Sequence, residues 1–244
     1  MPLTVAEASA WLQRGHAVEL LMDALPWAEE AASRDDDAYA RYRRDRAFPA
    51  RSGGVPVHVS VTLAAQFEGA CPNLAADLRC TIYQDRPLAC RIYPAEFNPF
   101  VPVDRARKGC PPEAWGIAGI DEHPLLLRDG EPAERGLQSD VSAMRASASA
   151  DVETKAALCT LLGIHAAALA NEGLLVFRPT PEDLRDTLVR ARSHPSSRAA
   201  TDWTVVTNRR STADTLKSSA ADAAMTRAGT SGAVHYLAFL PDEP

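Results

Sequence analysis

Residues 71–94 read CPNLAADLRCTIYQDRPLACRIYP, and a further cysteine, Cys110, is separated from Cys90 by nineteen residues. The stretch is rich in turn-forming residues, so it cannot bury much apolar area by itself. A segment of this kind needs another source of cohesion, and a metal bound by cysteine thiolates supplies one. The sequence therefore predicts a turn-rich segment organised around a metal that is bound by Cys71, Cys80, Cys90 and Cys110.

Four thiolates suit either Zn(II) or an iron–sulfur cluster, because soft sulfur donors match both. The gaps of eight, nine and nineteen residues between the cysteines let the loops converge, at about 3.3 Å of reach per residue. No close Cys-x-x-Cys pair, which is typical of zinc knuckles, is present. Proline follows Cys71 and Cys110, as it follows a ligand in bacterial ferredoxins. We predict one centre, with iron–sulfur slightly favoured over zinc.

Other residues near the cysteines have possible roles at this centre. A four-thiolate site is negatively charged, and Arg86 and Arg91 lie beside the cysteines, so both are predicted to contact the metal cofactor. For Arg86 the alternative is a turn that starts the short helix carrying Cys90. His58 is an alternative to Cys110 as the fourth ligand, whereas the fifth cysteine, Cys159, lies in an apolar helical stretch typical of a core.

The segments Cys80-Thr-Ile-Tyr, Arg86-Pro and Cys90-Arg-Ile-Tyr-Pro, at these offsets, resemble the signature of the YkgJ-type cysteine-cluster proteins. These proteins are described as zinc- or iron-chelating, so the resemblance implies metal binding. Cys71, followed by Pro-Asn-Leu, also fits the family pattern, and a related pattern occurs in flagellin lysine N-methylases. The chain departs from the family because it lacks the earlier Cys-x-x-Cys-x-x-Cys-Cys group, which leaves cysteines for one centre only.

Composition limits the classes of partner. The formal net charge of −6 argues against a general nucleic-acid binder, since neutralising phosphates needs a basic surface. The sequence has no apolar run long enough to span a membrane, and its start lacks the features of a secretory signal. We expect a cytoplasmic protein whose partners are a metal ion or cluster and a protein. In that compartment thiols stay reduced, so a disulfide framework is the weaker account of the five cysteines.

The periodicity predicts an α+β fold. A capping box at Thr4-Val-Ala-Glu7 predicts a helix to about Arg14, and alternation over 55–61 predicts a strand, at a sheet edge because of Pro56. Beyond residue 141 we predict a mainly helical half, with the turn-rich metal segment packed on a small β element. The predicted helices and strands of that half are residues 156–162, 164–171, 180–192 and 212–228 as helices, and 174–177, 203–207 and 233–240 as strands.

The predicted domains are a cysteine-cluster region over residues 1–125 and a helical α/β region over 126–244, or one integrated domain. No metalloprotease, P-loop, nucleophile-elbow or dinucleotide-binding motif is present, so no catalytic residue is predicted and enzymatic activity stays undecided. If all four cysteines bind the metal, the centre is closed and cannot activate a water. A structural or partner-binding role is the first hypothesis, and an iron–sulfur redox protein or oxidoreductase component is the alternative.

Overall fold

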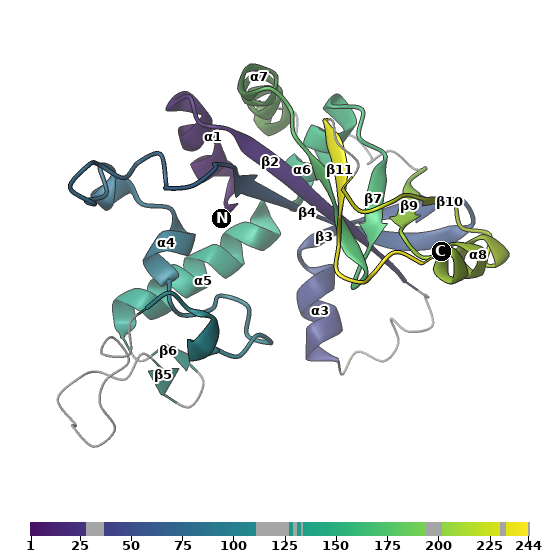
Figure 1. Ribbon diagram of the computed structural model, residues 1–244, viewed down its shortest axis with the longest axis horizontal. Helices are drawn as coiled ribbons and strands as arrows, with labels where there is room; N and C mark the ends of the chain where they lie inside the picture. The colour runs from purple at the N-terminus through teal and green to yellow at the C-terminus, as the bar shows by residue number, and fades with distance from the viewer. Residues whose placement is uncertain are drawn as a thin grey trace. The chain divides into compact units, whose positions relative to one another are not determined.

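The computed structural model describes residues 1–27, 37–110, 127–128, 131–132, 134–193, 202–229 and 233–243. The chain forms two compact units, coloured by residue number in Figure 1. The sheet unit combines Met1–Pro72 with Ser149–Pro244, and the loop unit is the intervening Asn73–Ala148. This division differs from the predicted boundary at residue 125, which lies outside the described residues. Its physical basis is strand pairing between the two ends of the chain.

In the part of the sheet unit that the structure describes, nine strands form one sheet. The strands are β1 (Pro2–Leu3), β2 (Val18–Pro26), β3 (Ala47–Ser52), β4 (Val55–Ala65), β7 (Ala166–Leu169), β8 (Gly173–Phe177), β9 (Thr204–Thr207), β10 (Ala223–Met225) and β11 (Val234–Ala238). The helices that the structure describes in this unit are α1 (Val5–Gln13), α3 (Ala38–Arg44), α6 (Val152–Leu161), α7 (Pro181–Ser193) and α8 (Arg210–Ser218).

Strand β2 is the branch point of this sheet. One edge of β2 pairs along its length with β4 in antiparallel orientation. On the other edge, Leu20–Met22 pairs antiparallel with β8, and Asp23–Ala24 pairs parallel with β7. The antiparallel branch continues to β11, and the parallel branch continues through β9 to β10. The sheet thus joins residues that are about 150 positions apart in sequence.

Alternating burial explains how this sheet holds its helices. Val18, Leu20, Met22 and Ala24 are all at most 1% exposed, which places one face of β2 in the core. Helix α7 packs against both α1 and α6. Helix α1 also contacts β4, and α6 also contacts β3. In the described part of the chain, no helix has the length and apolar character needed to cross a membrane.

The two helices with the clearest local signals are confirmed. The Glu7 amide donates to the Thr4 hydroxyl at 3.2 Å and the Thr4 amide donates to the Glu7 carboxylate at 2.8 Å, which is the predicted capping box. Helix α7 begins at Pro181, where the Asp183 amide donates to the Thr180 hydroxyl at 3.2 Å.

Three predictions for secondary structure are wrong. Residues 164–171 contain the strand β7 rather than a helix, because parallel pairing with β2 and β9 outweighs the helical propensity of its alanines. Helix α8 ends at Ser218, and the predicted helical run to residue 228 contains β10. Strand β4 is paired on both sides rather than lying at an edge. Pro56 is tolerated there because the pairing with β2 begins one residue later, at Val57.

The α+β class is confirmed, but a mainly helical second half is not, since it contributes five of the strands described above. In the loop unit, the described elements are η1 (Tyr83–Asp85), α4 (Leu88–Ile92), η2 (Arg105–Arg107), β5 (Leu127–Arg128), β6 (Glu131–Pro132) and most of α5 (Arg135–Ala150). Its core cluster consists of Ile92, Ala95, Val141 and Met144, with partly buried Leu88, Phe97 and Leu137 packed against it.

Candidate metal centre

Cys80 lies at the neck of a closed loop formed by residues 73–81. It pairs with Leu74 as an isolated antiparallel bridge. The Thr81 amide and hydroxyl both donate to the Asn73 carbonyl, at 2.8 and 3.0 Å. At the tip, Leu78 has a positive φ of 65° and is 76% exposed. These hydrogen bonds fix the backbone beside Cys80, although the loop itself buries little apolar surface.

Cys90 lies in the short helix α4, which follows a turn as predicted. Pro87 is the N-cap, and its carbonyl accepts a hydrogen bond of 2.9 Å from the Cys90 amide. Arg86 holds this turn, because its Nε donates to the Tyr83 carbonyl at 3.0 Å and its guanidinium stacks 3.8 Å from the Tyr83 ring centroid. The structure therefore gives Arg86 the turn-forming role that the sequence offered as an alternative.

Helix α4 is anchored on α5 by apolar and charged contacts. Ile92, 1% exposed, belongs to the same buried cluster as Val141 and Met144 of α5. Beside this cluster, the Arg91 guanidinium lies 2.5 Å from the Asp140 carboxylate, which is the more buried partner. Arg91 thus has a carboxylate partner in the loop unit, and its predicted role beside a metal stays a prediction.

Cys110 follows a segment that is tied to the residues just after α4. The Gly109 amide donates to the Tyr93 hydroxyl at 2.7 Å, and the Lys108 ammonium pairs with the Glu96 carboxylate. The same ammonium lies 5.4 Å from the Tyr93 ring centroid. Tyr93 comes three residues after Cys90, so these contacts hold the backbone beside Cys110 next to the end of the helix that carries Cys90.

The structure does not bring the predicted ligands together as a finished site. Cys71 belongs to the sheet unit, and Cys80, Cys90 and Cys110 belong to the loop unit. All four are half-buried and form no disulfide. Within the described ranges, no three His, Cys, Asp or Glu side chains form a group that could hold a metal ion. The donor set fits a soft metal chemically, and metal binding would have to complete its arrangement.

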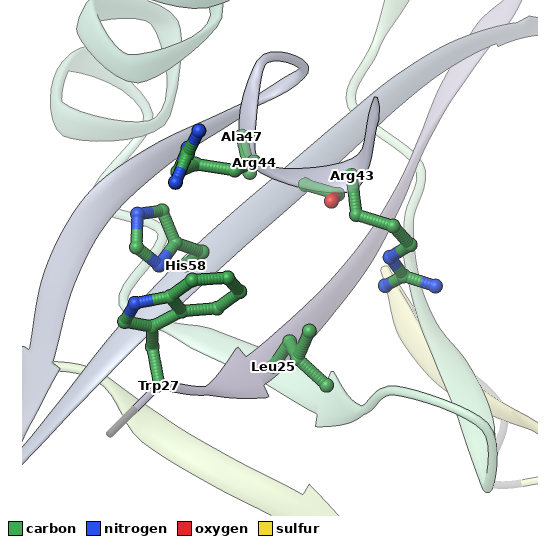
Figure 2. Close-up of a pocket in the computed structure, with 7 residues that line it drawn as sticks. Leu25, Trp27, Arg43, Arg44, Ala47 and His58 are labelled. Carbon is green, nitrogen blue, oxygen red and sulfur yellow. The ribbon is translucent and has the colours of Figure 1, made fainter. Parts of the chain in front are cut away.

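His58 and Cys159 have separate surroundings in the sheet unit. Cys159 is 1% exposed in α6, and burial raises the pKa of its thiol to about 12, which is the predicted core role. His58 lines a shallow pocket that contains no cysteine, and its ring lies edge-on to Trp27 with centroids 5.2 Å apart. Figure 2 shows the Arg44 guanidinium beside this imidazole. Burial, and then the charge of Arg44, lower the pKa of His58.

The sequence did not reveal the contacts that fix these pieces of backbone. The hydrogen bond between Gly109 and Tyr93 joins residues sixteen positions apart, and the ion pair between Arg91 and Asp140 joins a helix to one much later in the chain. The sequence offered one signal, the tyrosine three residues after Cys90, and a tyrosine at that place equally suits simple packing.

Comparison with known proteins agrees with the signature. No curated protein and no solved structure matches the chain. Residues 22–111, less than half of the chain, match the model of the CxxCxxCC family. The match begins within β2, well before the signature, and ends one residue after Cys110. Over that segment the chain therefore has the predicted resemblance to a family described as "Putative zinc- or iron-chelating domain".

Proposed function

We propose that this protein holds one zinc ion or iron–sulfur cluster through Cys71, Cys80, Cys90 and Cys110. The observation that carries the proposal is that the described part of the loop unit combines a small apolar cluster with three disulfide-free, half-buried cysteines. The buried cluster has four members, and the nearby side chains of Leu78, Tyr83 and Tyr93 are 76%, 59% and 48% exposed. A unit whose described residues bury so little apolar surface gains stability from a bound metal.

Local contacts prepare the loop unit for this role. The neck of the 73–81 loop, helix α4 and the segment docked on Tyr93 each fix the backbone beside one cysteine. Metal binding then has to fix these pieces relative to one another rather than order each residue separately. The entropic cost of assembling the centre is correspondingly smaller.

A centre closed by four thiolates stabilises a fold or transfers electrons, but it leaves no position for a water to be activated. We therefore assign a structural or partner-binding role, in the cytoplasm, where the thiols remain reduced. Arg86 and Arg91 complete the proposal as positive charges near an anionic centre. The contact of Arg86 with Tyr83 holds it beside the start of α4, and Arg91, within α4, is paired with Asp140.

The test is elemental analysis and an optical spectrum of protein purified without oxygen. We expect near-stoichiometric zinc or iron, its loss in Cys90→Ser, and its retention in Cys159→Ser, which is the matched control because Cys159 is buried in α6. Wild-type protein without bound zinc or iron would overturn the proposal. Full metal content in Cys90→Ser would show that the ligands are other residues.

A redox function is the second candidate, and the prolines after Cys71 and Cys110 favour it. In this case the anaerobic protein is brown, with a visible absorption that bleaches on chemical reduction. A colourless protein with one zinc per chain would reject it.

A further inference from the structure

The three cysteines of the loop unit differ in how their backbone is held. Cys90 lies in α4, which packs against α5 through the apolar cluster of this unit (Figure 1). Cys80 lies at the hydrogen-bonded neck of the 73–81 loop. Cys110 ends the 98–110 segment, in which the structure describes no buried side chain. Apolar burial therefore contributes little to the position of Cys110, and polar contacts have to fix it.

Tyr93 contacts the residue that immediately precedes Cys110. The Gly109 amide donates a hydrogen bond of 2.7 Å to the Tyr93 hydroxyl. Lys108 adds a second connection, because its ammonium pairs with the Glu96 carboxylate and lies 5.4 Å from the Tyr93 ring centroid. The Lys108 side chain is only 13% exposed, which indicates that this end of the segment packs closely on the residues that follow α4.

The place of Tyr93 in the chain makes its hydroxyl a link between two of the predicted ligands. Tyr93 is the C-cap of α4, and Cys90 lies three residues earlier in the same helix. The tyrosine ring is rigid, so only two side-chain torsions determine where the hydroxyl lies. The hydrogen bond from Gly109 therefore fixes the backbone beside Cys110 relative to the helix that carries Cys90.

We propose that Tyr93 is a positioning residue for the metal centre, and that its hydroxyl holds Cys110 in place as a ligand. The inference rests on the proposed function, because Tyr93 has this role only if Cys110 binds the metal. Ordering the backbone at Gly109 in advance lowers the entropic cost of recruiting Cys110, so the metal is retained more tightly. The ion pair between Lys108 and Glu96 does not need the hydroxyl, so its loss weakens retention without abolishing it.

The test measures the Zn(II) affinity of the whole chain, prepared metal-free without oxygen, by competition with a chromophoric chelator. Tyr93→Phe keeps the ring and removes only the hydroxyl. Its affinity for Zn(II) is expected to fall about fivefold, which is the typical contribution of one hydrogen bond to an equilibrium. Tyr83→Phe is the matched control, because Tyr83 belongs to the same unit, is 59% exposed and stacks its ring on Arg86. It is expected to keep the wild-type affinity.

A double-mutant cycle separates positioning of Cys110 from a general structural role. If Tyr93 acts through Cys110, Tyr93→Phe causes no further loss of Zn(II) affinity in a Cys110→Ser background. A second loss of about the same size in that background would overturn the inference, since the hydroxyl would then act on another part of the unit.

Failure of this inference and failure of the proposed function give different results. Equal Zn(II) affinities for wild type and Tyr93→Phe would overturn the role of Tyr93 and leave the metal centre standing. A wild-type chain that binds no Zn(II) in this assay would overturn both.

Discussion

Truncation of Ile92 tests whether the small core of the loop unit positions the cysteine helix. Ile92 is 1% exposed and packs with Val141 and Met144, so Ile92→Ala removes three buried carbon atoms from a cluster with few other members. At about 0.8 kcal/mol per buried methylene, the transfer term alone is about 2.4 kcal/mol. The cavity that remains adds to this, so we expect a loss of about 3–4 kcal/mol in unfolding free energy.

The assays are urea unfolding and hydrogen exchange at loop-unit amides, each measured with and without a metal chelator. Leu78→Ala is the matched control, because Leu78 is an apolar residue of the same unit that is 76% exposed. Its change is expected to stay within about 0.5 kcal/mol. If Ile92 positions Cys90, Ile92→Ala also weakens metal retention, whereas the control does not. A loss below about 1 kcal/mol in Ile92→Ala would refute the packing argument, because relaxation of the neighbouring side chains into the cavity would not recover that much of the lost stability.

Three further changes test other parts of the structure. Gly173→Ala would place a Cβ 2.5 Å from the Tyr236 ring, and we expect about 1–3 kcal/mol of destabilisation by thermal unfolding; an unchanged melting temperature would contradict this contact. Cys110→Ser should lower metal content while His58→Gln leaves it intact, and the reverse result in elemental analysis would make His58 the fourth ligand. The pKa of His58 is lowered in the folded state, so the unfolded chain binds more protons as pH falls through the usual histidine range. Wild-type stability should therefore decrease below about pH 6.5 more steeply than that of His58→Gln, as measured by urea midpoints; parallel profiles would exclude this linkage.

Elements with local signals could be predicted from the sequence. The capping box at Thr4, the proline that starts α7 and the Arg86-Pro87 turn before α4 each determine a helix start through neighbouring residues. Burial of Cys159 also followed from its apolar helical neighbours.

Elements that depend on distant pairing could not be predicted. Residues Ala166–Leu169 are a strand because Ala168 pairs with Asp23 and with Val206, and nothing within that short alanine run distinguishes it from a helix. The candidate site shows the same limit. The cysteines and their offsets were visible, but the hydrogen bond from Gly109 to Tyr93 depends on the folded chain.

The position of the loop unit in the chain has an energetic consequence for metal binding. Residues 73–148 connect β4 to α6, while the sheet is closed by pairs between residues on either side of them, such as Leu20 with Phe177. If metal loss loosens the loop unit, the sheet still closes around a connection of the same number of residues. The entropic cost of closing a loop depends on its length only logarithmically, at about 0.6 kcal/mol per doubling. A change in the compactness of this connection therefore has a small effect on the free energy of forming the sheet. The stabilisation from metal is therefore concentrated in the loop unit, whose described residues form only a small apolar cluster.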